Sequence, residues 1–205
     1  MERPKGFATF EKRGEYNYRT SAYLQFGHSS KSIGCCLLLN PGAAVFINQR
    51  ISEAGQETGE VSLDPTMKQL VSLLHEIYQD CSIEGRFYIY NLFPLQDTDA
   101  ERAIGTIERL LRSGELLIEQ CLVPVSELQE HPWVLLGWGL AYRKEWVLFA
   151  ELKKRWMEVI RQAAIPSFGK RHSKRGDYYH PCPQIPTKRP QIIKELTQIY
   201  IDTIK

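Results

Sequence analysis

Residues 34–46 of the chain read GCCLLLNPGAAVF, and this stretch decides which fold we expect. Five apolar residues, 35–39, follow one another without alternation, which is typical of a strand that is covered on both faces. The run ends at Asn40, and Pro41 disfavours a helical conformation of Asn40, so the chain must turn there. Gly42 allows another part of the chain, or a ligand, to approach closely. The sequence therefore places one polar side chain at the end of a buried strand.

Two further apolar segments, residues 86–92 and 133–138, are predicted to form strands, and segments with a helical spacing of apolar residues separate the strands. Helices are expected over residues 65–78, 99–114, 115–121, 141–163 and 189–204. Strands that alternate with helices of this length predict βαβ units and a parallel sheet. We therefore expect an α/β fold, a three-layer α/β/α sandwich around a central, mainly parallel four-stranded sheet.

The remaining segments are expected to be peripheral to this sheet. Residues 1–30 are predicted to form short edge strands or a packed N-terminal arm, 49–61 a loop, and 177–180 a short strand. Residues 166–190 are read as a basic, Pro-rich loop. The chain shows no internal repeat, and 205 residues suffice for one core, so we expect a single domain over residues 1–205.

The composition is that of an ordinary globular protein, with 43% hydrophobic and 24% charged residues. The first residues are polar, and no apolar run approaches the ~20 residues of a membrane span, so we expect a cytoplasmic protein without a signal peptide. The cysteines lack the spacing of a disulfide framework or a metal site, so we expect buried thiols, no metal and no cofactor. The five are Cys35, Cys36, Cys81, Cys121 and Cys182.

The net charge of +2 is unevenly distributed along the chain. Between Pro166 and Pro190, six basic residues against the single acid Asp177 give +5, which leaves −3 for the rest of the chain. The basic residues are Lys170, Arg171, Lys174, Arg175, Lys188 and Arg189. We expect this segment to contact a phosphate-bearing partner, and a solvated surface loop is the alternative.

Polar residues follow the predicted strands at the edge where sheets of this kind bind ligands, beyond the carboxyl ends of the strands. Asn40 follows the first strand, Asn91 ends the second, and the third runs into Gly-Trp-Gly at 137–139. His180 lies further along, in the segment YYHPCPQIP. A turn or a surface loop explains each residue taken singly. Together they predict a site at one edge of the sheet.

The order of these motifs resembles the uracil-DNA glycosylase superfamily, and more closely its mismatch-specific branch. Those enzymes end the first strand with Gly-Ile-Asn-Pro-Gly, where this chain has Leu-Leu-Asn-Pro-Gly at 38–42. Asn91 matches the Asn that reads the base edge, and LLGWG at 135–139 is similar to their Leu-Leu-Trp-Gly. Their last motif, His-Pro-Ser-Pro, is His-Pro-Cys-Pro at 180–183 here. The resemblance covers residues 33–186, most of the chain.

The chain departs from this pattern and also has a second resemblance. The strict uracil enzymes carry an Asp in the first motif, which is missing here, and Cys182 replaces the Ser of the last motif. The chain also looks like a bacterial family of uncharacterised domains that shares LNP, DPT, NLFP, WG and HP motifs. That family carries no function with it.

The glycosylase resemblance implies that the protein hydrolyses the N-glycosidic bond of a base flipped out of DNA, and that it acts as a monomer. Asn40 would orient a water near C1′ of the sugar, and His180 would donate a hydrogen bond to the departing base. Asn91 offers a donor and an acceptor to the Watson–Crick edge of a pyrimidine. The six basic residues would bind DNA phosphates, and Trp138 is expected to be structural.

The base site implied by the resemblance also includes Pro41, Gly42 and Phe46, although core packing explains Phe46 equally well. In the uracil-strict enzymes a Tyr follows the Pro of the first motif and excludes a methyl group at C5. Here Gly42, Ala43 and Ala44 project nothing large at that place. We therefore expect activity on C5-modified or mismatched pyrimidines, in DNA repair or in bacterial defence against viral DNA.

Two other classes of function remain open. A non-catalytic nucleic-acid-binding module on the same fold would need neither Asn40 nor His180. A nucleoside- or nucleotide-processing enzyme would use the basic loop as a lid over a phosphate. Asp64, Asp97 or Asp99 would then be the acid–base candidates, and helix capping explains these three at least as well.

Overall fold

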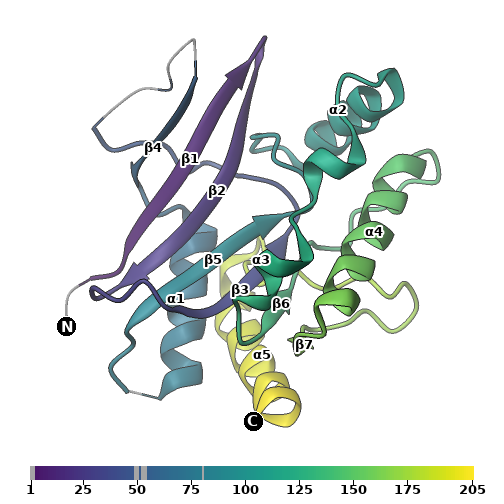
Figure 1. The fold of residues 1–205 in the computed structure, drawn as a ribbon. Helices are drawn as coiled ribbons and strands as arrows, with labels where there is room; N and C mark the ends of the chain where they lie inside the picture. Colours follow the sequence, from purple (N-terminus) through teal and green to yellow (C-terminus); the bar gives the residue numbers. More distant parts are fainter. Residues whose placement is uncertain (1–2, 49–50, 52–54, 80) are drawn as a thin grey trace.

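The computed structural model describes residues 3–48, 51, 55–79 and 81–205, and within them one mixed sheet runs through the molecule with helices on both faces (Figure 1). Its strands are β1 (Lys5–Arg13), β2 (Tyr16–Phe26), β3 (Ser32–Leu38), β4 (Gln56–Val61), β5 (Gly85–Asn91), β6 (Val134–Leu136) and β7 (Ser167–Phe168). Their order in the sheet is β4-β1-β2-β5-β3-β6-β7. The α/β fold class is therefore confirmed.

The three strands predicted from apolar runs are neighbours in the parallel part of this sheet. β3 pairs with β5 on one side and with β6 on the other, and both pairings are parallel. β7 extends this part by pairing with β6, also in parallel. The carboxyl ends of β5, β3 and β6 therefore meet at one edge, as expected.

The prediction of a four-stranded, mainly parallel sheet is wrong, because the described sheet has seven strands and most of its paired residues are antiparallel. The predicted N-terminal arm is a long hairpin, β1–β2, and β2 pairs with β5 in the middle of the sheet. Apolar side chains alternate along β1, which explains why it forms a strand with one buried face. β4 forms at residues 56–61 of the predicted loop, whose residues 49–50 and 52–54 lie outside the described part.

The helices cover the two faces of the sheet and make two cores. They are α1 (Pro65–Tyr78), α2 (Ala100–Ser113), α3 (Val125–Gln129), α4 (Val147–Ala163) and α5 (Arg189–Ile204), with 3-10 turns at Ile118–Cys121 and Pro186–Lys188. α1 and α5 pack side by side on one face, where Leu70, Leu74 and Leu196 are buried. α2, α3 and α4 cover the other face, where Ile104 and Trp156 are buried. Burying both faces of the sheet supplies the hydrophobic driving force for the fold.

Three local predictions are corrected. Instead of the helix expected over 115–121, the chain forms a 3-10 turn at Ile118–Cys121, and the short α3 follows it. The helix expected from residue 141 begins at Val147. The strand expected near 177–180 is only an isolated bridge between Arg171 and Tyr178, and the last strand of the described sheet, β7, forms earlier in the chain. No helix in the described residues has both the length and the apolar character needed to cross a membrane.

The cysteines largely follow the expectation of buried thiols. Cys35, Cys36 and Cys121 are buried, Cys182 is half-buried, and Cys81 is exposed. Burial raises the pKa of the Cys121 thiol to about 12, which keeps it protonated at neutral pH. Within the described residues, His, Cys, Asp and Glu form no group of three or more that is placed to hold a metal ion.

Candidate functional site at the carboxyl ends of the parallel strands

Asn40 and Asn91 lie at the shared carboxyl end of β3 and β5. Leu38, the last residue of β3, is in register with Asn91, and the backbone N–H of Leu92 donates to the carbonyl of Leu38 at 2.8 Å. Asn40 follows two residues later, where the chain leaves the sheet. The parallel pairing that the apolar run predicted therefore brings these two segments together.

The side chain of Asn40 is oriented by two backbone carbonyls. Its Nδ2 donates to the carbonyl of Asp97 at 2.8 Å and to that of Pro41 at 3.0 Å. The N–H of Asp97 in turn donates to the carbonyl of Pro41, and Gln96 Nε2 donates to the carbonyl of Gly42. Because both carbonyls engage the amide nitrogen, the amide oxygen of Asn40 is the atom available to a ligand.

His180 reaches the same edge through close packing against the end of β6. A Cβ on Gly137 would lie 2.7 Å from Pro181, so only glycine admits Pro181 at this place. The N–H of Gly139 donates to the carbonyl of Tyr178 at 2.8 Å and holds the segment that leads to His180. The Gly-Trp-Gly and His-Pro motifs are therefore physically coupled.

The imidazole of His180 is held in the turn by one ring nitrogen. Its Nδ1 lies 3.1 Å from both the backbone N and the carbonyl O of Cys182, so Nε2 is the ring nitrogen that the turn leaves available. Burial lowers the pKa of His180, while the contact with Cys182 and the nearby charge of Asp64 oppose this shift. The ring is therefore neutral at pH 7 and can donate one hydrogen bond.

Asn40 and His180 line one small cavity of about 50 Å³ together with Asp64, which comes from the N-terminus of α1. Its other lining residues are Arg19, Leu38, Gly42, Thr66, Met67 and Ile89. Asp64 Oδ1 accepts the N–H of Met67 at 2.8 Å and caps α1, as predicted. Its Oδ2 faces Gly42, where an added Cβ would lie 3.5 Å away. The cavity therefore contains a carboxylate next to the Asn-Pro-Gly motif, which itself has no Asp.

Asn91 lies beside this cavity and is bound to Arg19. Arg19 Nη2 donates to Asn91 Oδ1 at 3.0 Å, which uses one of the two lone pairs of this oxygen. The role of Asn91 as a donor and an acceptor to a base stays a prediction. Its Nδ2, like Nε and Nη1 of Arg19, is buried and has no hydrogen-bond partner within the described residues.

Sequence reasoning missed the role of Arg19, because alternation along β2 breaks at this residue. Phe10 is in register with Arg19 but Thr9 with Ser21, so Thr20 is an extra residue, a β-bulge. Tyr18 and Arg19 are consecutively buried, and Thr20 and Ser21 are exposed. A bulge re-aims the side chains beside it, which explains why this arginine points inward. The sequence signal was present for Asp64, which precedes Pro65 at a helix start: it predicted a helix cap and, for a nucleotide-processing enzyme, an acid–base candidate.

The contacts of Phe46 and Trp138 are those of residues that stabilise the fold. Phe46 is buried in the core against Phe10, with ring centroids 5.0 Å apart, and is not among the residues of the small cavity. Its position is that of a core residue, which was the alternative to a place in the base site. Trp138 is buried and donates from Nε1 to Asp177 Oδ1 at 2.9 Å.

Two residues of the basic segment are engaged in contacts of their own. Lys170 Nζ lies 2.6 Å from Glu195 of α5, so its charge is compensated. Arg175 Nη1 donates to the carbonyl of Leu140 at 3.1 Å, and its guanidinium lies 5.7 Å from the centre of the Tyr142 ring. These two side chains are positioned by the protein itself.

The other four basic residues differ in exposure. Arg171, Lys174 and Lys188 are exposed. Arg189 is half-buried, and its Nε donates to the carbonyl of Pro183 at 3.2 Å, close to the His-Pro-Cys-Pro turn. Arg189 also lowers the pKa of Cys182, although burial raises it more.

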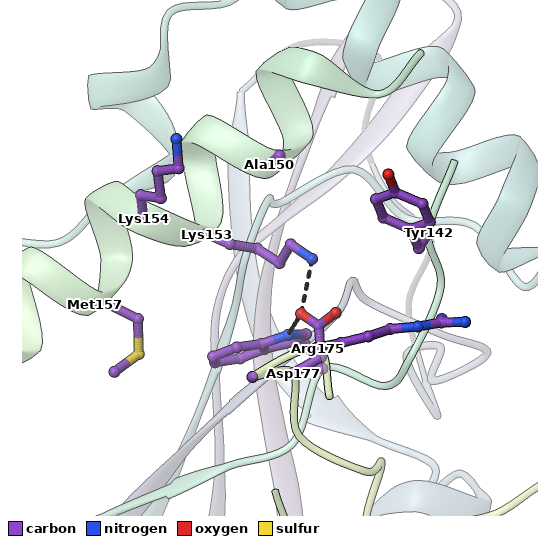
Figure 2. A pocket seen from close by; sticks show the side chains of 9 residues that line it. Tyr142, Ala150, Lys153, Lys154, Met157, Arg175 and Asp177 are labelled. Atoms are coloured by element: carbon purple, nitrogen blue, oxygen red, sulfur yellow. Dashed lines mark hydrogen bonds and ion pairs between the residues drawn. The ribbon is translucent and has the colours of Figure 1, made fainter. Parts of the chain in front are cut away.

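A larger groove of about 590 Å³ lies between α4 and the loops around Tyr142 and Arg175 (Figure 2). Figure 2 shows Lys153 reaching across from α4 to Asp177, and the two groups form an ion pair at 2.7 Å. Tyr142 is 62% exposed at the rim. An exposed aromatic ring beside cationic side chains is a surface on which nucleic-acid bases can stack.

Known proteins do not identify the chain. Comparison with protein-family models, curated proteins and solved structures gives no match. The function must therefore be inferred from the chemistry of these residues.

Proposed function

We propose that the protein is a DNA glycosylase, which hydrolyses the N-glycosidic bond of a pyrimidine flipped out of DNA. The observation that carries this proposal is the small cavity in which Asp64, Asn40 and His180 meet. These groups are a carboxylate, an oriented amide oxygen and a neutral imidazole. Hydrolysis of a glycosidic bond needs a positioned water on one side of the sugar and a donor to the leaving base on the other.

The carboxylate and the amide oxygen are suited to hold the water. A cavity of about 50 Å³ can hold a water molecule, whose share of liquid volume is about 30 Å³, if it offers two to four polar partners. Asp64 Oδ2 and the Asn40 amide oxygen are acceptors, so a water between them would present its lone pair to C1′. Asp64 would then supply the acid that the first motif lacks.

His180 is suited to assist the departing base. Its pKa is lowered by burial, so at pH 7 the ring is neutral and donates without carrying a charge. A donor fixed in a buried site stabilises the negative charge that develops on the base as the bond breaks. The basic segment and the groove beside Tyr142 would bind the surrounding DNA.

The preferred base is proposed to be a C5-modified or mismatched pyrimidine, and the role DNA repair or defence against viral DNA. No large side chain projects from residues 42–44. A base site without a bulky side chain at C5 of the pyrimidine discriminates weakly against a substituent at C5. Oligonucleotides that carry uracil, mismatched thymine or a bulky C5-modified pyrimidine would rank these substrates by the abasic sites formed.

The test of the proposal compares two helix caps. Asp64→Asn keeps the capping oxygen of α1 but removes the carboxylate, so base release should fall at least ~100-fold while the unfolding temperature is nearly unchanged. Asp99 caps α2 in the same way, accepting from Arg102 at 2.9 Å, and does not line the cavity. Asp99→Asn is therefore the matched control and should release bases at the wild-type rate. Equal rates for the two variants would contradict the assignment of Asp64.

The Asp64 carboxylate also supports a second candidate function, an enzyme that acts on free nucleosides or nucleotides. Asp64 was an acid–base candidate for that class, and it lines the cavity with His180. Assays of the same variants on deoxynucleosides and on oligonucleotides separate the two. Cleavage of the free substrates alone would replace the DNA glycosylase by this second candidate, and DNA binding without any cleavage would indicate a binding module.

A further inference from the structure

Arg19 is a buried cation whose hydrogen-bonding groups are mostly unused. Its exposed fraction is 6%. Nη2 donates to Asn91 Oδ1, but Nε and Nη1 are buried and have no hydrogen-bond partner among the described residues. The Nδ2 of Asn91 has none there either. Buried polar groups in proteins are nearly always bonded, so a cluster of unbonded donors calls for an explanation.

Arg19 also forms no direct ion pair with an acid of the described residues. Burial lowers the pKa of Arg19 to about 10, so the guanidinium is still protonated at pH 7. The Asp64 carboxylate, which lines the same small cavity, opposes this shift and so compensates the charge of Arg19 in part. A buried charge without a direct counter-ion destabilises a protein, so a site of this kind is retained where it serves binding or catalysis.

Arg19 lines both the Asp64 cavity and a second cavity of about 100 Å³, as Ile89 does. Polar residues of the second cavity include Arg13, Arg19, Thr20, Ser21, Asn91 and Gln120. Among the described residues that line it, none is Asp or Glu. The charge of Arg13 is paired with Glu11 at 2.7 Å, which leaves Arg19 as the cation of this lining without a direct ion pair in the described residues.

Where Arg19 and Asn91 line the second cavity, the groups without a partner among the described residues are hydrogen-bond donors, not acceptors. A guanidinium has donors only, and the unbonded atom of the Asn91 amide is its donor Nδ2, since Oδ1 already accepts from Arg19. The complementary group has acceptors only and a negative charge, as a phosphate does. We propose that Arg19 and Asn91 bind the phosphate group of a nucleotide, either free or within DNA.

This inference goes beyond the proposed reaction, because it requires binding of a phosphate and no bond cleavage. It also relates the two cavities. Because Arg19 lines both cavities, a phosphate bound to it would lie next to the cavity that Asp64 and His180 line. The site could therefore belong to a glycosylase or to a nucleotide-processing enzyme.

The experiment measures the unfolding temperature with inorganic phosphate, deoxyuridine monophosphate, a short single-stranded oligonucleotide and, as the phosphate-free control, deoxyuridine. The wild type should gain about 5 °C or more with a phosphate-bearing ligand at 100 times its Kd. The nucleotide and oligonucleotide arms show whether the phosphate comes from a free nucleotide or from DNA. An equal gain with deoxyuridine, or no gain with any ligand, would overturn the proposal.

Arg19→Met assigns the response to the guanidinium. Without ligand its stability should differ little from that of the wild type, because removing a buried cation offsets the lost hydrogen bond to Asn91, and the gain with phosphate should disappear. Arg112→Met removes an exposed arginine elsewhere and should respond as the wild type does. If Arg19→Met does not fold, Asn91→Ala decides: a tenfold or larger rise in the Kd supports the site, and an unchanged Kd overturns it. A wild-type response in Arg19→Met would also overturn it.

Discussion

His131 is buried between two hydroxyl groups and titrates far from its ordinary range. Its Nδ1 lies 2.7 Å from Ser32 Oγ and its Nε2 lies 2.8 Å from the Tyr90 hydroxyl. Burial lowers the pKa of His131 to about 4, against about 6.5 in the unfolded chain. Between these two values the unfolded state binds more protons, so the free energy of unfolding falls as the pH drops from 6.5 to 4.

The first prediction follows from this shift. At pH 4, His131 should have reduced the free energy of unfolding by about 3 kcal/mol relative to pH 7. His131→Gln can keep both hydrogen bonds but does not titrate, so its loss of stability from pH 6.5 to 4.5 should be clearly smaller. Urea unfolding at several pH values measures both slopes. Parallel curves for the two proteins would show that His131 is not the titrating group.

A second residue-scale prediction concerns Asn40, whose amide is oriented by the carbonyls of Pro41 and Asp97. Its oxygen is proposed to act on the water in the transition state, so Asn40→Ala should reduce kcat for base release by more than tenfold and leave the affinity for DNA nearly unchanged. Single-turnover cleavage and a DNA-binding titration separate the two effects. A loss confined to affinity would assign Asn40 to substrate binding instead.

At the scale of elements, α4 begins where a side chain from another helix caps it. Glu108 of α2 accepts the N–H of Phe149 at 2.9 Å and that of Leu148 at 3.3 Å, and it is 7% exposed. The residue at the α4 N-cap, Trp146, provides no side-chain cap. The start of α4 therefore depends on a carboxylate about 40 positions away in the sequence, and local patterns could not place it.

The third prediction tests this cap. Glu108→Ala leaves two N–H groups at the α4 N-terminus without their acceptor and should lower the free energy of unfolding by about 2 kcal/mol. Arg112 binds Glu108 from the surface, with a side chain that is 67% exposed, so Arg112→Ala should change it by less than about 0.5 kcal/mol. Denaturant unfolding of both variants gives the comparison. Similar losses would mean that the ion pair, rather than the cap, stabilises α4.

An element could be predicted where the residues that determine it lie within one short stretch of the sequence. The run at 35–39 and the segment 86–92 predicted strands of one parallel sheet, because burial on both faces leaves a continuous apolar pattern, and their adjacency is a finding of the structure. The hairpin β1–β2 was missed as part of the central sheet, since pairing with β5 is set by tertiary contacts. The same holds for the site. Asn40 and His180 were predicted to share it, and Asp64 was named only as an acid–base candidate of the alternative enzyme class. Its place beside Asn40 and His180 depends on how α1 packs, and that of Arg19 depends on a bulge.

At the scale of the whole molecule, the uneven charge remains the argument for a polyanionic partner, but the structure divides the basic segment. Lys170 is paired with Glu195, so removing Lys170 frees an acid as it deletes a base. Arg171 and Lys174 are exposed, and no ion pair to an acid in the described residues is seen for either. We therefore expect these two to carry most of the segment's interaction with DNA phosphates.

The last prediction is a change in salt dependence. The affinity constant K for DNA falls as salt rises, so the slope of log K against log salt is negative. If Arg171 and Lys174 each neutralise one phosphate of single-stranded DNA, the double variant Arg171→Ala/Lys174→Ala should make this slope less negative by about 1.4. Lys170→Ala is the matched control on the same segment, and its slope should stay closer to that of the wild type. Fluorescence anisotropy of a labelled oligonucleotide at several salt concentrations gives the three slopes. If the double variant keeps the wild-type slope, the segment is a solvated surface loop and DNA must be bound elsewhere, for which the groove beside Tyr142 is the next surface to mutate.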